Sequence, residues 1–462
     1  MLDLALFCFV MAFLALGVKR PFIWVLAYLY IDILAPQKIG WSITSALPIS
    51  LIAFCAAFAG WLLTDSKRGT RITYRQGLMI FLLLYCFMTT GWAEYQDSAL
   101  EKWDWVWKAL VFAIFLPFTM TTRLRIEGVA LTMVLTAAAI IISGAIKTIL
   151  AGGGYGTLYL FVDDNSGIYE SSTISAVAIA MIPLILWLVK HGTIFPDDWR
   201  VRTFAYALIF ACLLIPVGTE ARTGLVCIAA LGVMLLRDAK RRMLYITGAA
   251  VLGMTALPFL PQSFYERMST ITGFEQDASA STRVAVWNWT LDYVEDHPMG
   301  GGFDAYRANK FTYEMPVVKD GGTATTVTRE EVTDEARAYH SAYFEMLGEQ
   351  GYPGFIAWLW LHLSGLWQME VIRRRWKKRT GAKEQWQAPL ANALQLGQAV
   401  YLVGSLFIGI AYQPFVLMLI GMQCALWLYC KKADSAAAEV SVRGNRAPLP
   451  AKRPPKHQGA VA

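Results

Sequence analysis

Three short segments combine charge, glycine and aromatic residues in otherwise apolar surroundings, and the first is 219–224. It carries Arg222 in a tight turn between two apolar stretches. A charge at the edge of an apolar helix bundle is costly unless it is paired or used. A planar guanidinium with five donors suits bidentate binding of a phosphate. Arg222 therefore has two interpretations: a phosphate ligand, or a structural cation that pairs with Glu220 or extends to lipid headgroups.

The second segment begins at Ser281. Arg283 and Trp287 are four residues apart, so on a helix over 282–296 they share a face where cation and ring contact each other or a sugar. The apolar positions of this helix recur at helical spacing: Val284, Trp287, Leu291 and Val294. This pattern predicts an amphipathic helix, which either lies along the membrane surface or packs on the rest of its loop.

Three candidate substrate contacts follow that helix. His297 precedes a proline, which is typical of a helix stop, and Gly300 and Gly302 allow the backbone to approach a ligand closely. Glycine-rich turns after helices are also common in proteins without ligands. These residues therefore have two interpretations: contacts to a substrate, or an ordinary turn after a helix.

The third segment contains His340, Glu345 and Glu349. The intrinsic pKa of histidine lies near working pH, so His340 at the mouth of a helix bundle could accept a proton from an acceptor hydroxyl as a catalytic base. A structural histidine is the alternative. Glu345 and Glu349 are one helical turn apart and either orient His340 or a bound sugar, or satisfy polar partners inside the bundle.

The composition and the long apolar blocks of the chain predict a membrane protein. Of 462 residues, 56% are hydrophobic and 16% are charged, and apolar blocks long enough to cross a bilayer recur throughout. We expect an all-α, polytopic bundle of about 12–13 transmembrane helices. The blocks are 2–18, 21–35, 48–64, 77–93, 104–120, 128–150, 172–189, 203–218, 223–236, 243–260, 341–371, 389–409 and 414–430.

Lys and Arg concentrate in alternate loops, which indicates the cytoplasmic side. The C-terminus is then cytoplasmic, and the long acidic loop after Pro261 and all three segments face the periplasm. If the first two blocks form a re-entrant hairpin, the count of spans falls and the other loops keep their sides. We divide the chain into N-terminal helices (1–125), central helices (126–260), a periplasmic loop with short helices (261–340), C-terminal helices (341–432) and a disordered cytoplasmic tail (433–462).

No feature predicts a metal, a cofactor or a nucleic-acid partner. The net charge of +7 resides in short loops, where topology explains it. Asp163 and Asp164 are adjacent carboxylates without further ligands, which makes a poor cation site. The seven cysteines lie in or beside apolar blocks without metal-ligand spacing.

Together the three segments resemble the O-antigen ligase and polymerase superfamily, whose pattern is an arginine-bearing hairpin and a long periplasmic loop that ends in a histidine-led helix. The likeness covers roughly the second half of the chain: 219–224, Arg283 with Trp287, the 297–302 turn, and His340 with Glu345. Glu220 stands where the family often has serine. Residues 19–41 additionally resemble the subgroup of O-glycosylation ligases associated with exosortase systems.

The resemblance implies a GT-C-like, metal-independent glycosyltransferase of the bacterial inner membrane. Its donor would be an undecaprenyl-diphosphate-linked glycan, and its acceptor would be a hydroxyl of a lipid, a protein or a glycan. Membrane lipids would surround the protein. Arg222 and Arg283 would bind the diphosphate, and His340 would be the general base, with inversion at the anomeric carbon. A repeat-unit polymerase shares this chemistry and differs in its acceptor. A lipid-linked glycan transporter is a third hypothesis, which would require inverted repeats and paired midplane charges.

Overall fold

The computed structural model describes residues 2–40, 42–67, 70–152, 167–256, 258, 260, 265, 278–320, 325–379, 381 and 384–444. The first half contains α1 (Leu2–Lys19), α2 (Phe22–Leu34), α3 (Pro36–Ile39), α4 (Ile43–Ala46), α5 (Ile49–Thr64), α6 (Tyr74–Thr90), α7 (Gln96–Thr119), α8 (Arg123–Ala151), α9 (Ser171–His191), α10 (Trp199–Gly218) and α11 (Arg222–Leu235). The second half contains η1 (Leu236–Asp238), α12 (Arg242–Ala256), α14 (Ala278–Asp296), η4 (Ala305–Ala308), β1 (Lys310–Asp320), β2 (Thr325–Glu335), α15 (Ala342–Trp376), α16 (Gln387–Gly404) and α17 (Pro414–Gly444).

Every apolar block predicted from the sequence coincides with a helix. Within the described residues, four helices are long and apolar enough to cross a membrane, namely α8, α9, α10 and α17, and three shorter helices, α2, α5 and α11, are also apolar. The protein is therefore a mostly helical, multi-pass membrane protein. The larger number of 12–13 spans and the GT-C-like type stay predictions.

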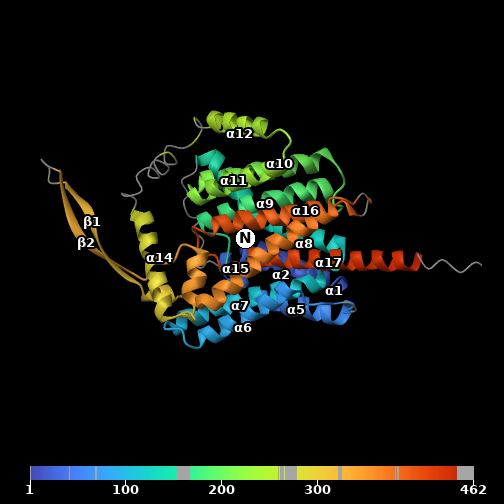
Figure 1. Ribbon diagram of the computed structural model, residues 1–462, viewed down its shortest axis with the longest axis horizontal. Coiled ribbons are helices and arrows are strands. Elements are labelled where there is room, and N and C mark those ends of the chain that lie inside the picture. Colours follow the sequence, from blue (N-terminus) through green and yellow to red (C-terminus); the bar gives the residue numbers. More distant parts are fainter. Residues whose placement is uncertain are drawn as a thin grey trace, which may run out of the picture.

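The helices run between two opposite ends of the bundle (Figure 1). Helices α9 and α16 are antiparallel, because Gly404 packs beside Ala176 near the start of α9, while Trp187 Nε1 donates to the Trp386 carbonyl at 3.2 Å near its end. We call the end with Glu170, Thr219 and Ala342 the site end. The opposite end, with His191, Trp386, Arg375 and Lys431, is the basic end.

The segment before α15 contains a β-hairpin as well as helices, which corrects the expectation of short helices alone. Strands β1 and β2 are antiparallel, with Lys310 opposite Glu335 and Asp320 opposite Thr325. The hairpin projects beyond α14 at the site end (Figure 1). Gly321–Gly322, flanked by runs of β-branched residues at Val317–Val318 and Thr325–Thr328, is a hairpin signal in the sequence.

Helix α14 forms where the sequence predicts it, but only part of the predicted apolar face is buried. Val286, Thr290 and Val294 are at most 1% exposed, whereas Val284 and Leu291 are 40% and 47% exposed. The buried face packs on α15. This packing favours the interpretation of α14 as a helix held by the protein.

Helix α15 is interrupted at Gly351, whose φ of 60° is not helical. A kink leaves backbone groups without helical partners, and these groups must bond elsewhere. The turn 298–302 provides the partners: Gly301 N donates to Gly348 O at 3.0 Å, Gly302 N to Glu349 O at 2.9 Å, and Tyr352 N to Pro298 O at 3.0 Å.

The C-terminal tail begins as a helix rather than as a disordered segment. Helix α17 continues to Gly444 at the basic end (Figure 1). Residues 433–444 are rich in alanine, a strong helix former, and Asp434 pairs with Arg375 at 3.0 Å. Of the predicted disordered tail, 445–462 lies outside the described residues.

Candidate functional site

The turn that carries Arg222 lies at the site end between α10 and α11. Thr219 ends α10, its hydroxyl lies 3.0 Å from the hydroxyl of Ser175 on α9, and Arg222 is the first residue of α11. Glu220 has a φ of 52° and is 9% exposed. Within the described residues its buried Oε1 has no hydrogen-bond partner. A left-handed, buried glutamate costs free energy, and such positions cluster at functional sites.

His340 also has a left-handed backbone, with a φ of 47°. The residues on both sides of it are fixed. Trp287 Nε1 donates to the Tyr339 carbonyl at 2.9 Å, and the Trp287 ring stacks on Phe344 with centroids 5.0 Å apart. Ala342 N donates to Ser405 O at 2.9 Å. The predicted sugar contact Trp287 thus holds the segment that positions His340.

Opposite charges act on the exposed imidazole of His340. Partial enclosure by protein atoms lowers its pKa below the usual value, the positive charges of Arg283 and Arg337 lower the pKa further, and the negative charge of Glu170 opposes them. A lowered pKa leaves the imidazole neutral, and therefore able to accept a proton, at neutral pH. His340, Arg283 and Glu170 consequently form one electrostatic group at the site end.

Glu170 was not predicted from the sequence. It is the N-cap of α9, and its Oε2 accepts from Thr173 N at 2.6 Å and from Thr173 Oγ1 at 2.7 Å. The sequence signal is an acidic residue immediately before an apolar helix, which is ordinary for a helix start. Its proximity to His340 depends on the packing of α9 and α15 against α16 and could not be predicted from sequence spacing.

Glu345 and Glu349 belong to a second, buried cluster beside the His340 segment. Lys102 Nζ of α7 lies 2.8 Å from Glu345 Oε1, 2.7 Å from Glu349 Oε1 and 3.5 Å from Asp304 Oδ1. Glu345 Oε2 accepts from Ala411 N at 2.9 Å, and Glu349 Oε1 accepts from Asp304 N at 3.0 Å. We call these four residues the Lys102 cluster. Of the two predicted interpretations of the glutamates, the contacts match polar pairing inside the bundle.

The Lys102 cluster joins four elements that surround the site end. Lys102 comes from α7, Asp304 precedes η4, both glutamates come from the first part of α15, and Ala411 precedes α17. The Lys102 ammonium also lies over the Tyr412 ring, 5.3 Å from its centroid. Sequence reasoning missed Lys102 and Asp304, because single charges near helix ends are also typical of loops.

The structure places His297, Gly300 and Gly302 away from His340, at the opposite end of α14. The exposed His297 ring stacks on Tyr293 at 4.2 Å. Gly300 and Gly302 have φ of 88° and 81°, and an added Cβ would lie 2.4 Å from Glu349 O at Gly300 and 2.6 Å from Ala93 Cβ at Gly302. The close backbone approach expected at these glycines is to the chain itself. Their role in substrate binding stays a prediction, and Asp163 and Asp164 lie outside the described residues.

Two family models match the chain. Residues 1–193 match a family of unknown function, and residues 206–359 match the O-antigen ligase family. No curated protein matches the chain. The second match contains Arg222, Arg283 and His340, and it supports an enzyme of the O-antigen ligase superfamily with glycan ligase or polymerase activity. Lys102 and Glu170 lie in the first match, so both matched regions contribute to the site end.

Proposed function

We propose that the protein is a glycan ligase of the bacterial inner membrane. It transfers an oligo- or polysaccharide from undecaprenyl diphosphate to an acceptor hydroxyl on a lipid or a protein, with the site end facing the periplasm and the C-terminus in the cytoplasm. The observation that supports this most is the electrostatic group of His340, Arg283 and Glu170, of which His340 and Arg283 lie within the O-antigen ligase match. The likeness of residues 19–41 to exosortase-associated ligases favours a protein acceptor.

Arg222 and Arg283 bind the diphosphate in this proposal. Guanidinium groups form bidentate, charge-assisted hydrogen bonds to phosphate oxygens and stabilise the negative charge that develops on the departing diphosphate. Both side chains are partly buried, and water is therefore partly excluded from them. Arg222 heads α11, where the positive end of the helix dipole adds to the attraction for an anion.

His340 acts as the general base. Its neutral imidazole takes the proton of the acceptor hydroxyl while the hydroxyl oxygen attacks the anomeric carbon. The bond from that carbon to the diphosphate oxygen breaks, and its electron pair leaves with undecaprenyl diphosphate, so the anomeric configuration inverts. The positive charge of Arg283 lowers the pKa of His340 and thereby keeps the base unprotonated before the reaction.

The test replaces His340 in a deletion strain that carries the gene on a plasmid. Asparagine tolerates the left-handed backbone at this position, so His340→Asn removes the imidazole with little backbone strain. We expect transfer to fall by about 10²–10⁴-fold at equal protein level, with undecaprenyl-linked glycan accumulating. The matched control is His191→Asn at the basic end, which should transfer normally. Normal transfer by His340→Asn refutes the general-base assignment.

The same deletion strain distinguishes ligase from polymerase. Loss of a ligase leaves long glycan chains on undecaprenyl diphosphate, because polymerisation continues without attachment. Loss of a polymerase leaves single repeat units on the carrier. Intact surface glycans with normal carrier intermediates would argue against both activities, and against the transporter hypothesis, and would favour another function.

A further inference from the structure

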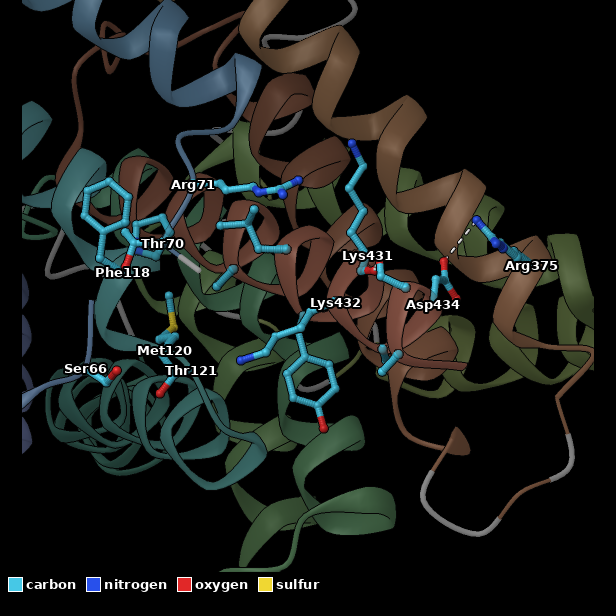
Figure 2. A pocket seen from close by; sticks show the side chains of 17 residues that line it. Ser66, Thr70, Arg71, Phe118, Met120, Thr121, Arg375, Lys431, Lys432 and Asp434 are labelled. Atoms are coloured by element: carbon cyan, nitrogen blue, oxygen red, sulfur yellow. Dashed lines mark hydrogen bonds and ion pairs between the residues drawn. The ribbon is translucent and has the colours of Figure 1, made fainter. Parts of the chain in front are cut away.

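A cavity lies at the basic end, on the opposite side of the bundle from His340. Its volume is about 760 Å³, and it is bounded by the connection between α5 and α6, the end of α7, and α17 (Figure 2). The proposed glycan transfer uses none of its residues. The cavity opens at the surface, so a ligand could enter it without unfolding the bundle.

The cavity has an excess of positive charge. Four cationic side chains and one carboxylate line it, which is a net charge of +3: Arg71, Arg375, Lys431, Lys432 and Asp434. The Asp434 carboxylate is already paired with two arginines, because Arg375 Nη1 lies 3.0 Å from its Oδ2 and Arg379 contacts its Oδ1. Within the described residues, Arg71 and Lys432 form no ion pair. Figure 2 shows both around the opening, with the Arg375–Asp434 pair to one side.

Polar and apolar groups lie next to these charges. The hydroxyls of Thr70 and Thr121 line the cavity and can donate hydrogen bonds to an anion. Phe118 and Leu428 supply an apolar wall from α7 and α17. A site with cations and hydroxyls at its mouth and apolar side chains along a membrane helix matches a ligand with a phosphate and a hydrocarbon chain.

We propose that this cavity binds the phosphate of an anionic phospholipid. The chain's own segment 445–462 is a poor occupant, since it carries Arg446, Lys452, Arg453 and Lys456 and no acidic side chain. Soluble phosphate offers the same charge without the hydrocarbon chain, and the apolar wall favours the lipid. Zwitterionic lipids carry the phosphate together with a cation, which the positive lining repels.

The test measures lipid binding to the purified full-length protein by native mass spectrometry. Phosphatidylglycerol, phosphatidylcholine and inorganic phosphate are titrated separately. The variant is Arg71→Gln with Lys432→Gln, and the matched control is Arg200→Gln with Arg202→Gln, two basic residues of α10 that do not line the cavity. We expect phosphatidylglycerol to bind about 30-fold more weakly to the variant, at about 1 kcal/mol for each cation and 1.4 kcal/mol for each factor of ten.

The outcomes separate the possible ligands. Selective binding of phosphatidylglycerol that the variant loses and the control retains supports the proposal. Displacement of the lipid by millimolar phosphate overturns the lipid assignment in favour of soluble phosphate. Equal weakening in variant and control overturns the site, since the attraction is then diffuse. If the double variant fails to fold, Lys432→Gln alone should weaken binding about 5-fold, and unchanged binding to it overturns the proposal.

Discussion

Replacement of Lys102 by methionine tests the buried charge cluster most directly. Lys102 is 13% exposed and Glu349 is fully buried, and their contact is 2.7 Å. At an effective dielectric constant of 20, each of the three Lys102 contacts is worth about 5–6 kcal/mol in Coulomb energy. Repulsion among the three carboxylates and the cost of desolvation offset most of that sum.

The loss of unfolding free energy in Lys102→Met comes from the carboxylates that keep their negative charge after the lysine is removed. Methionine fills a similar volume but leaves two or three carboxylates without their cation, and breaking a buried ion pair in this way costs about 3–5 kcal/mol. Glu349→Gln should cost less, about 1–3 kcal/mol, because the amide oxygen still accepts from Lys102 and Asp304, while the amide nitrogen replaces Oε2, which has no hydrogen-bond partner among the described residues.

The assay is reversible unfolding in mixed micelles, with the free energy of unfolding measured for the two single variants and for the double variant. We expect the double variant to lose about 1–3 kcal/mol less than Lys102→Met alone, since it removes one of the unpaired carboxylates. A loss below about 1 kcal/mol for Lys102→Met would refute the reasoning. So would a double variant whose loss equals the sum of the single losses.

Three further predictions concern the site end. Glu170→Gln removes the charge that raises the pKa of His340, so the acid limb of the rate against pH should move to lower pH, and an upward shift contradicts the assigned electrostatics. Gly300→Ala should destabilise the protein by more than about 2 kcal/mol, because its φ of 88° and the 2.4 Å approach to Glu349 O exclude a Cβ. Gly232→Ala on α11, with no atom within 4 Å of the added Cβ, should instead be neutral or stabilising in the same unfolding assay. Arg222→Lys keeps the charge but loses the bidentate fork, so kcat/KM for the lipid-linked donor should fall about 10–100-fold, and an unchanged value argues against diphosphate binding there.

The sequence predicted most of the helices, because a block of apolar residues long enough to span a bilayer is legible in one dimension. It also located α14 and the three polar segments. The apolar face predicted for α14 was partly right: Val294 is buried as expected, but Val284 and Leu291 are exposed, and Val286 and Thr290 are buried in their place. The side of a helix that becomes buried depends on which other elements pack against it. The spacing of apolar residues in α14 was compatible with more than one buried side.

Lys102 and Glu170 were not predicted, because their roles depend on contacts between distant parts of the chain. Lys102 meets Glu345 across 243 residues, and no local pattern specifies such a pair. Glu170 is an ordinary N-cap until α9 is placed near His340. The hairpin of β1 and β2 is different, because its β-branched runs and its Gly321–Gly322 pair were present in the sequence and were outweighed by the surrounding helical pattern.

The Lys102 cluster limits how this protein can be divided. Residues 206–359 match a ligase family by themselves, yet that segment ends inside α15 and contains both glutamates and Asp304 without their lysine. A fragment cut at those boundaries would bury three acidic groups with no counter-ion. Transplanting the matched segment onto another scaffold therefore requires the first half of this chain, or a lysine supplied from the same direction.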